Sequence, residues 1–319
     1  MRKKITKFLL NIFSLLINKT KRYNNNMNKN IEKSKNFMKK GDFIEISESQ
    51  KKPDASKKSK KNSKKVPKVK FDPKAKLDVD KKTSDVFERK GYALETMLGV
   101  GSFGQVFKAV RVAEPSIGMF CATKVMDLKK MPKIFKTKFL PRELAALMEI
   151  SHPYIIRVFD IFRSNDKIYV FMEFADNGDI ARYLRLNGPV NEARARYWFT
   201  QIVEAMYYLH ERLFIVHRDI KIENILLCEN NVAKLTDFGF ACEAVDDEGF
   251  TILSETFCGT RPYYSPEILF NKGYNPLKAD TWAMGVVLYI LLHNKFPFHH
   301  KNKEQQQTEV LDPKYINDR

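Results

Sequence analysis

His217-Arg218-Asp219-Ile220-Lys221-Ile222-Glu223-Asn224 stands shortly after a long helical pattern at residues 191–212. Leu235-Thr236-Asp237-Phe238-Gly239 comes next, with Asp237 thirteen residues after Asn224, and Ser265-Pro266-Glu267 closes the segment. Each of these short motifs is a weak signal alone, so its meaning depends on what precedes it in the chain.

A glycine-rich loop lies upstream between two predicted strands, at residues 92–100 and 106–112. The loop reads Leu98-Gly99-Val100-Gly101-Ser102-Phe103-Gly104-Gln105-Val106. Its glycines let the backbone approach a polyphosphate closely, with N–H groups facing the anion. A dinucleotide site would need a helix directly after the glycines, whereas alternating residues here predict a hairpin over phosphate. The loop alone leaves a simple turn open as the other interpretation.

The next predicted strand, at residues 121–125, carries Lys124 among apolar neighbours. A buried ammonium group is costly unless it is paired. We therefore expect an acidic partner on the helix predicted at residues 139–150. Glu143 is the predicted partner, and Glu149 is the alternative that more often belongs to a solvated surface.

The pattern then changes from strands to helices. Residues 168–174 predict a buried strand, and residues 191–212 predict a helix. The residues of that helix expected to face the protein core are Ala193, Tyr197, Ile202, Ala205 and Leu209. This change predicts an α+β fold with a small β-rich lobe and a larger helical lobe.

The charge of the chain is confined to one end. The chain has 319 residues and a formal net charge of +18. Residues 1–90 hold 28 basic and 10 acidic side chains, and the remaining residues hold 28 of each. A uniformly basic domain that wraps on nucleic acid is therefore disfavoured.

The basic arm itself divides into two predicted parts. Residues 1–22 hold an apolar run that is shorter than the roughly 20 residues of a transmembrane helix, so an amphipathic surface helix or an undocked tail is expected. Residues 23–90 are expected to be a disordered arm. Its lysine runs could bind an anionic lipid surface or nucleic acid, serve as a nuclear address, or be a solvated linker.

Cysteine usage bears on the compartment. Cys121, Cys228, Cys242 and Cys258 lie far apart, with no CxxC pair. We interpret them as reduced thiols of a cytoplasmic protein that could also be nuclear through its lysine-rich arm.

The full order of glycine loop, strand lysine, helix glutamate and the three later motifs resembles the eukaryotic protein kinases over roughly residues 92–298. Residues 139–143, 251–260 and 280–289 are similar to the testis-specific serine/threonine kinases of the calmodulin-dependent-kinase-like group. The resemblance implies a two-lobed kinase domain at residues 91–319. It also implies a monomer that transfers phosphate from ATP, with Mg²⁺, to protein serine or threonine residues.

The resemblance also assigns roles to residues. Asp219 would accept the proton of the attacking hydroxyl, and Lys221 would steady the γ-phosphate. The catalytic and metal-binding set would be Asp219, Lys221, Lys124, Glu143, Asn224 and Asp237. The backbone at residues 173–175 would meet an adenine edge. The nucleotide-contacting set would be Leu98, Gly99, Val100, Gly101, Ser102, Phe103, Gly104, Gln105, Val106, Ala122, Lys124, Glu173, Ala175 and Leu226.

Arg218 beside Asp219 implies control by phosphorylation of the activation loop, with Thr256 as the acceptor and Ser254 as the second candidate. Cys242 and Glu243 stand where such kinases often have a basic side chain that receives the phosphate. Regulation that depends less on phosphate is therefore an alternative interpretation.

The resemblance fades after Phe298, and Glu267 lacks the arginine that pairs with it in the family. A truncated large lobe is therefore expected. The alternative function is a catalytically weak kinase-like scaffold or a binding protein.

Overall fold

The computed structural model describes residues 80–101, 104–114, 116–134, 136–137, 140, 144, 147, 150–246, 248–299 and 301–312. They form two compact units. The smaller unit comprises residues 80–129 and 159–172, and the larger one comprises the described residues of 130–158 and 173–312. The smaller unit is built on a sheet and the larger one mainly on helices, so the predicted α+β class is confirmed.

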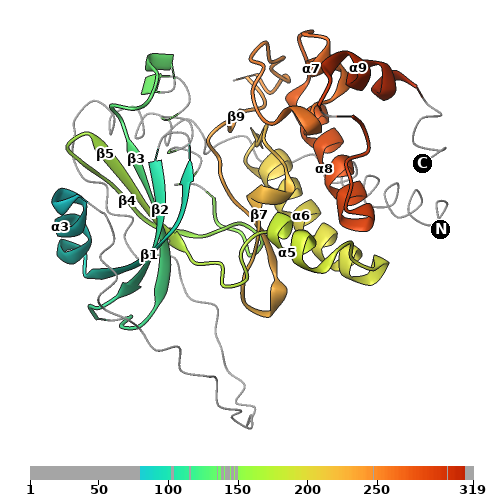
Figure 1. Ribbon diagram of the computed structural model, residues 1–319. Helices are drawn as coiled ribbons and strands as arrows, with labels where there is room; N and C mark the ends of the chain where they lie inside the picture. Colours follow the sequence, from blue (N-terminus) through green and yellow to red (C-terminus); the bar gives the residue numbers. More distant parts are fainter. Residues whose placement is uncertain are drawn as a thin grey trace. The chain divides into compact units, whose positions relative to one another are not determined.

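A five-stranded sheet forms the smaller unit, in the order β1-β2-β3-β5-β4 (Figure 1). The strands are β1 (Tyr92–Gly101), β2 (Gly104–Arg111), β3 (Phe120–Asp127), β4 (Val158–Ser164) and β5 (Lys167–Glu173). β2 pairs antiparallel with both β1 and β3, and this register sets Val106 opposite Lys124. The four strands that the sequence predicts in this unit are confirmed, with ends shifted by one or two residues.

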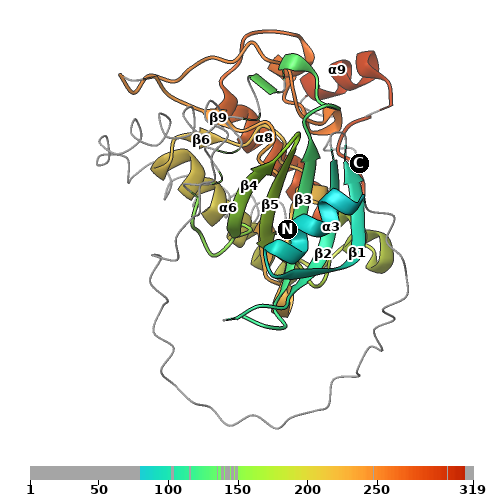
Figure 2. The same ribbon diagram turned by 90° about the vertical axis from the view of Figure 1, so that its left-hand side faces the viewer.

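Helix α3 (Lys81–Arg89) precedes the sheet and lies across one of its faces (Figure 2). The Asp80 carboxylate caps the helix by accepting a hydrogen bond from the Thr83 N–H at 3.1 Å. Phe87 is buried, and its ring centroid lies 5.3 Å from that of Phe171 and 6.3 Å from that of Phe107. The disorder predicted for residues 81–89 is therefore wrong. A nine-residue helix is marginal alone, and here packing on the sheet stabilises it.

The larger unit consists of five helices and short irregular elements among the described residues. The helices are α5 (Ile180–Asn187), α6 (Glu192–Arg212), α7 (Pro266–Leu269), α8 (Pro276–His293) and α9 (Lys303–Leu311). Two short antiparallel pairs join β6 (Ile215–Val216) to β9 (Cys242–Glu243) and β7 (Ile225–Leu227) to β8 (Ala233–Leu235). The described residues of this unit also form the 3₁₀ turns η2 (Ile222–Asn224), η3 (Glu229–Asn231) and η4 (Arg261–Tyr263).

Helix α6 confirms the predicted helix but not all of its predicted core face. Ala193 is exposed and Tyr197 is 47% exposed, whereas Trp198 is fully buried and donates its indole N–H to the Asn231 carbonyl at 2.9 Å. The large indole side chain, anchored by that bond, faces inward and leaves Tyr197 on the adjoining exposed side. The core positions Ile202, Ala205 and Leu209 are confirmed.

Helix α9 packs against α7 (Figure 1). Gln306 is wholly buried and donates a hydrogen bond to the Arg261 carbonyl at 3.3 Å. Glu267 in α7 is half-buried, and it forms no ion pair within the described part of the chain. Helix α9 thus belongs to the folded unit.

None of the four cysteines, Cys121, Cys228, Cys242 and Cys258, forms a disulfide within the described residues. Of the helices that the structure describes, none combines the length and apolar character needed to cross a bilayer. The predictions for residues 1–79, including the apolar run and the lysine runs, lie outside the described residues.

Candidate active site

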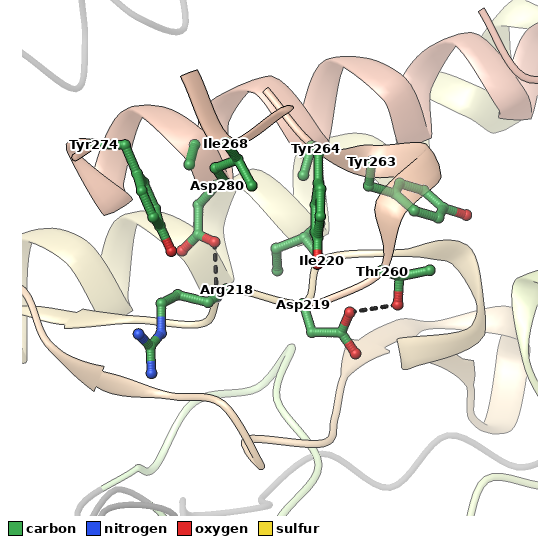
Figure 3. Close-up of a pocket in the computed structure, with 11 residues that line it drawn as sticks. Arg218, Asp219, Ile220, Thr260, Tyr263, Tyr264, Ile268, Tyr274 and Asp280 are labelled. Atoms are coloured by element: carbon green, nitrogen blue, oxygen red, sulfur yellow. Dashed lines mark hydrogen bonds between the residues drawn. The ribbon is translucent and has the colours of Figure 1, made fainter. Parts of the chain in front are cut away.

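Asp219 lies in the loop between β6 and η2, with a side chain that is only 5% exposed. Its Oδ1 accepts a hydrogen bond from the Thr260 hydroxyl at 2.7 Å (Figure 3). Its Oδ2 accepts one from Lys221 Nζ at 2.7 Å and one from Asn224 Nδ2 at 3.2 Å. The predicted residues Asp219, Lys221 and Asn224 are therefore brought together, and Thr260 joins them without having been singled out from the sequence.

Asn224 has one side-chain oxygen that could face a cation. Its Nδ2 donates both to Asp219 Oδ2 and to the Asp219 carbonyl, the latter at 2.9 Å. The main-chain carbonyl of Asn224 accepts a hydrogen bond from the Thr236 N–H at 3.0 Å. Asp237 directly follows Thr236, so this bond holds the chain next to Asn224 just before Asp237. Amide and carboxylate oxygens suit Mg²⁺, which takes its remaining ligands from water and phosphate. Within the described ranges no group of three or more His, Cys, Asp or Glu side chains gathers as a protein-only metal cage.

Asp280 of α8 anchors the backbone of this loop. Arg218 has a left-handed φ of 64°, a strained conformation for a residue with a side chain. Asp280 Oδ1 accepts its N–H at 2.8 Å (Figure 3), while Oδ2 accepts the His217 N–H at 2.8 Å and contacts His210 Nε2 at 3.0 Å. Burial alone would raise the pKa of Asp280, but the hydrogen bonds and charge supplied by His210 and His217 hold it below its ordinary value of 3.8.

Packing also holds the chain on either side of Asp237, the second candidate Mg²⁺ ligand. Phe238 is buried, and its ring centroid lies 5.0 Å from that of His217. His217 Nε2 lies 3.0 Å from the Thr236 carbonyl. Asp237 itself is exposed and has a left-handed φ of 65°. The loop thus presents the Asp237 side chain outward from a fixed backbone.

The glycine loop belongs to the smaller unit. A Cβ on Gly104 would lie 2.0 Å from the Val125 carbonyl oxygen, so Gly104 is required by the close approach of β3. A Cβ on Gly99 would meet nothing within 4 Å, so packing does not require that glycine. Ser102 and Phe103 lie outside the described residues, as does Glu143, so the predicted pairing of Lys124 with Glu143 stays a prediction.

The other predicted nucleotide contacts occupy both units. In the smaller one, Leu98 and Val100 are exposed on β1, Gln105 is exposed on β2, and Ala122 is buried on β3. In the larger unit, Glu173, Ala175 and Leu226 are half-buried.

Arg218 also contacts the predicted activation loop, the segment that holds Ser254 and Thr256. Its Nε donates to the Phe240 carbonyl at 2.6 Å, and its Nη1 lies 3.4 Å from the Ser254 hydroxyl. The Ser254 hydroxyl in turn accepts the Thr256 N–H at 3.3 Å. The hydroxyl of Ser254, the second predicted acceptor, therefore contacts Arg218.

Comparison with known proteins gives a consistent result. A family model described as the protein kinase domain matches residues 92–317, and thus extends beyond residue 298, where the sequence resemblance was expected to end. The chain is 39% identical over 219 residues to testis-specific serine/threonine-protein kinase 1 of Mus musculus, a match that covers 68% of this chain and 59% of that protein. It is 34% identical over 244 residues to testis-specific serine/threonine-protein kinase 4 of Homo sapiens, covering 72% and 73%. It is 35% identical over 224 residues to CBL-interacting protein kinase 28 of Oryza sativa subsp. japonica, covering 70% and 50%.

Proposed function

Because this chain belongs to the protein kinase family, we propose that it transfers the γ-phosphate of ATP to serine or threonine hydroxyls of protein substrates. The observation that carries the proposal is the Asp219 carboxylate, held by Thr260, Lys221 and Asn224. Phosphoryl transfer depends mainly on positioning and on charge neutralisation, and this arrangement supplies both.

Each residue of the loop has a defined task in this proposal. Asp219 accepts the proton of the attacking hydroxyl, and its hydrogen bonds fix the direction in which it does so. Lys221 Nζ, 2.7 Å from Asp219, places a positive charge where the transferred phosphate develops negative charge. Asn224 and Asp237 offer oxygen ligands to Mg²⁺, which when bound neutralises phosphate charge.

Nucleotide binding would also use the smaller unit. The loop from Gly99 to Gly104 would bring backbone N–H groups to the phosphates, and the open space at Gly99 is consistent with close approach of an anion. Lys124 of β3 would contact the α- and β-phosphates.

Regulation by phosphate is proposed at the activation segment. Thr256 remains the acceptor suggested by resemblance, and Ser254 gains support because its hydroxyl lies 3.4 Å from Arg218 Nη1. A phosphate on either residue would place charge near that guanidinium group. Mass spectrometry of the active protein, with Ser254→Ala and Thr256→Ala compared for turnover, distinguishes the two.

We separately propose that the basic arm determines where in the cell the protein lies. Its lysine runs would hold the protein to an anionic surface, in the cytoplasm or the nucleus. Removing residues 1–79 should change its distribution in cells but leave turnover within about twofold, because the match to the protein kinase domain begins at residue 92. Loss of turnover would contradict that separation.

The main test measures phosphate transfer from ATP-Mg²⁺ to a generic serine/threonine substrate such as casein. Asp219→Asn should lower kcat by about 10³-fold, within the range for a lost general base. The control is Asp85→Asn on the exposed side of α3, which should leave turnover unchanged. Unchanged turnover in Asp219→Asn would contradict the mechanism, and ATP binding with no transfer by the wild type would favour the scaffold alternative.

A further inference from the structure

An ion pair joins the end of β5 to β8 inside the larger unit. Glu173 Oε1 lies 2.5 Å from Lys234 Nζ, and the two side chains are only 25% and 16% exposed. The other carboxylate oxygen accepts the Arg157 N–H at 3.3 Å, and the Glu173 N–H donates to the Arg157 carbonyl at 2.8 Å. Glu173 is therefore bound on one side by a cation and on the other by the backbone of residue 157.

Backbone hydrogen bonds connect the same segment to β8. The Leu235 N–H donates to the Tyr154 carbonyl, and the Ile156 N–H donates to the Leu235 carbonyl, both at 2.9 Å. Residues 154–157 thus lie between β8 and Glu173. The contact between Glu173 and Lys234 closes a ring whose other links are main-chain hydrogen bonds, so it fixes the spacing of its two ends.

Both ends of this ring lead to residues of the proposed site. The main chain at Glu173 is where an adenine edge is expected, and Lys234 lies three residues before Asp237. Lys234 also lies opposite Leu226, an expected adenine contact, in the pairing of β7 with β8. We propose that the Glu173–Lys234 ion pair is a positioning element that sets nucleotide affinity by fixing the strand that leads to Asp237. This inference rests on the proposed function.

The surroundings of the pair favour a fixed geometry. Burial raises the pKa of the Cys228 thiol to about 12, and the nearby negative charge of Glu173 adds to this. The thiol therefore stays protonated near neutral pH and can donate a hydrogen bond to the Glu173 carboxylate. Removing Lys234 would leave a largely buried carboxylate without its cation, which is costly, whereas neutralising both partners costs less.

The structure offers a matched control in the smaller unit. Lys90 and Asp160 form an ion pair at 3.0 Å, with side chains 24% and 23% exposed, and neither belongs to the proposed site. Lys90→Met removes a cation of similar burial. It reports what the loss of a comparable pair does to stability alone.

The experiment measures the KM for ATP, the Kd of a fluorescent ATP analogue, kcat and the melting temperature in the full chain. Lys234→Met should raise KM and Kd by about tenfold with kcat within about twofold, a change of one decade in affinity. Lys234→Arg should restore both to within about threefold. Glu173→Gln should add little to Lys234→Met, because the two act through one contact.

The outcomes separate the two proposals. Equal KM values for Lys234→Met and Lys90→Met, or effects of Glu173→Gln and Lys234→Met that simply add, would overturn the positioning role. A wild-type chain that neither binds the nucleotide nor transfers phosphate would refute the proposed function, and this inference would fall with it.

Discussion

Replacing Asp280 by asparagine tests how the loop of the candidate active site, which carries Arg218 and Asp219, is held. The Asp280 side chain is 2% exposed, and its oxygens face two N–H groups and the His210 ring. An asparagine can keep an oxygen toward His217 and His210, but its NH₂ group then faces the Arg218 N–H. The Arg218 N–H and the NH₂ group that faces it are then both donors without an acceptor there, at a cost of about 1–3 kcal/mol for each buried donor left unpaired, and the remaining bonds lose their charge. We expect a loss of about 3 kcal/mol of unfolding free energy.

Urea unfolding at pH 7 measures this loss, and phosphate transfer measured on the folded variant reports the disturbed loop. Thr281→Ala is the control, since Thr281 is half-buried on the same helix and its hydroxyl donates to the Leu277 carbonyl of that helix at 3.0 Å. That control should change stability by less than about 1 kcal/mol. A loss below about 0.5 kcal/mol in Asp280→Asn would refute the anchoring role.

The same variant has a pH signature. The pKa of Asp280 is lower in the folded chain than its ordinary value of 3.8. Its stabilising contribution is therefore complete above the unfolded value and is lost as pH falls through the lower folded value. The stability gap between wild type and Asp280→Asn should narrow as the pH falls below about 4. A stability gap that widens below about pH 4 would contradict the lowered pKa of Asp280 in the folded chain.

Two further predictions concern the smaller unit. Phe87→Ala should lower the unfolding free energy by about 3–5 kcal/mol, because it leaves a cavity under α3. Thermal unfolding measures this loss, and an unchanged melting temperature would mean that α3 is not part of the core. Gly104→Ala should destabilise the fold, because its Cβ would clash with the Val125 carbonyl, whereas Gly99→Ala should leave the melting temperature unchanged and raise the KM for ATP. Equal melting temperatures for the two glycine variants would contradict the assigned packing.

The sequence predicted four of the five strands of the sheet and the long helix because their patterns are local. It failed at α3, where only Val86 and Phe87 are apolar enough to signal burial, and where the deciding partners lie on β2 and β5. It also misassigned Ala193 and Tyr197 to the core face of α6, since the Trp198 indole rather than the Tyr197 ring is fixed inside.

The sequence by itself determined which side chains make up the candidate site, because Asp219, Lys221 and Asn224 lie within six residues and need only a turn to meet. The tertiary structure decided how that chemistry is held. Thr260 and Asp280 reach the loop from 41 and 62 residues away, from Asp219 and Arg218 respectively. Such contacts depend on how α8 and the activation segment pack against the loop, and packing between distant segments leaves no periodic trace in the chain.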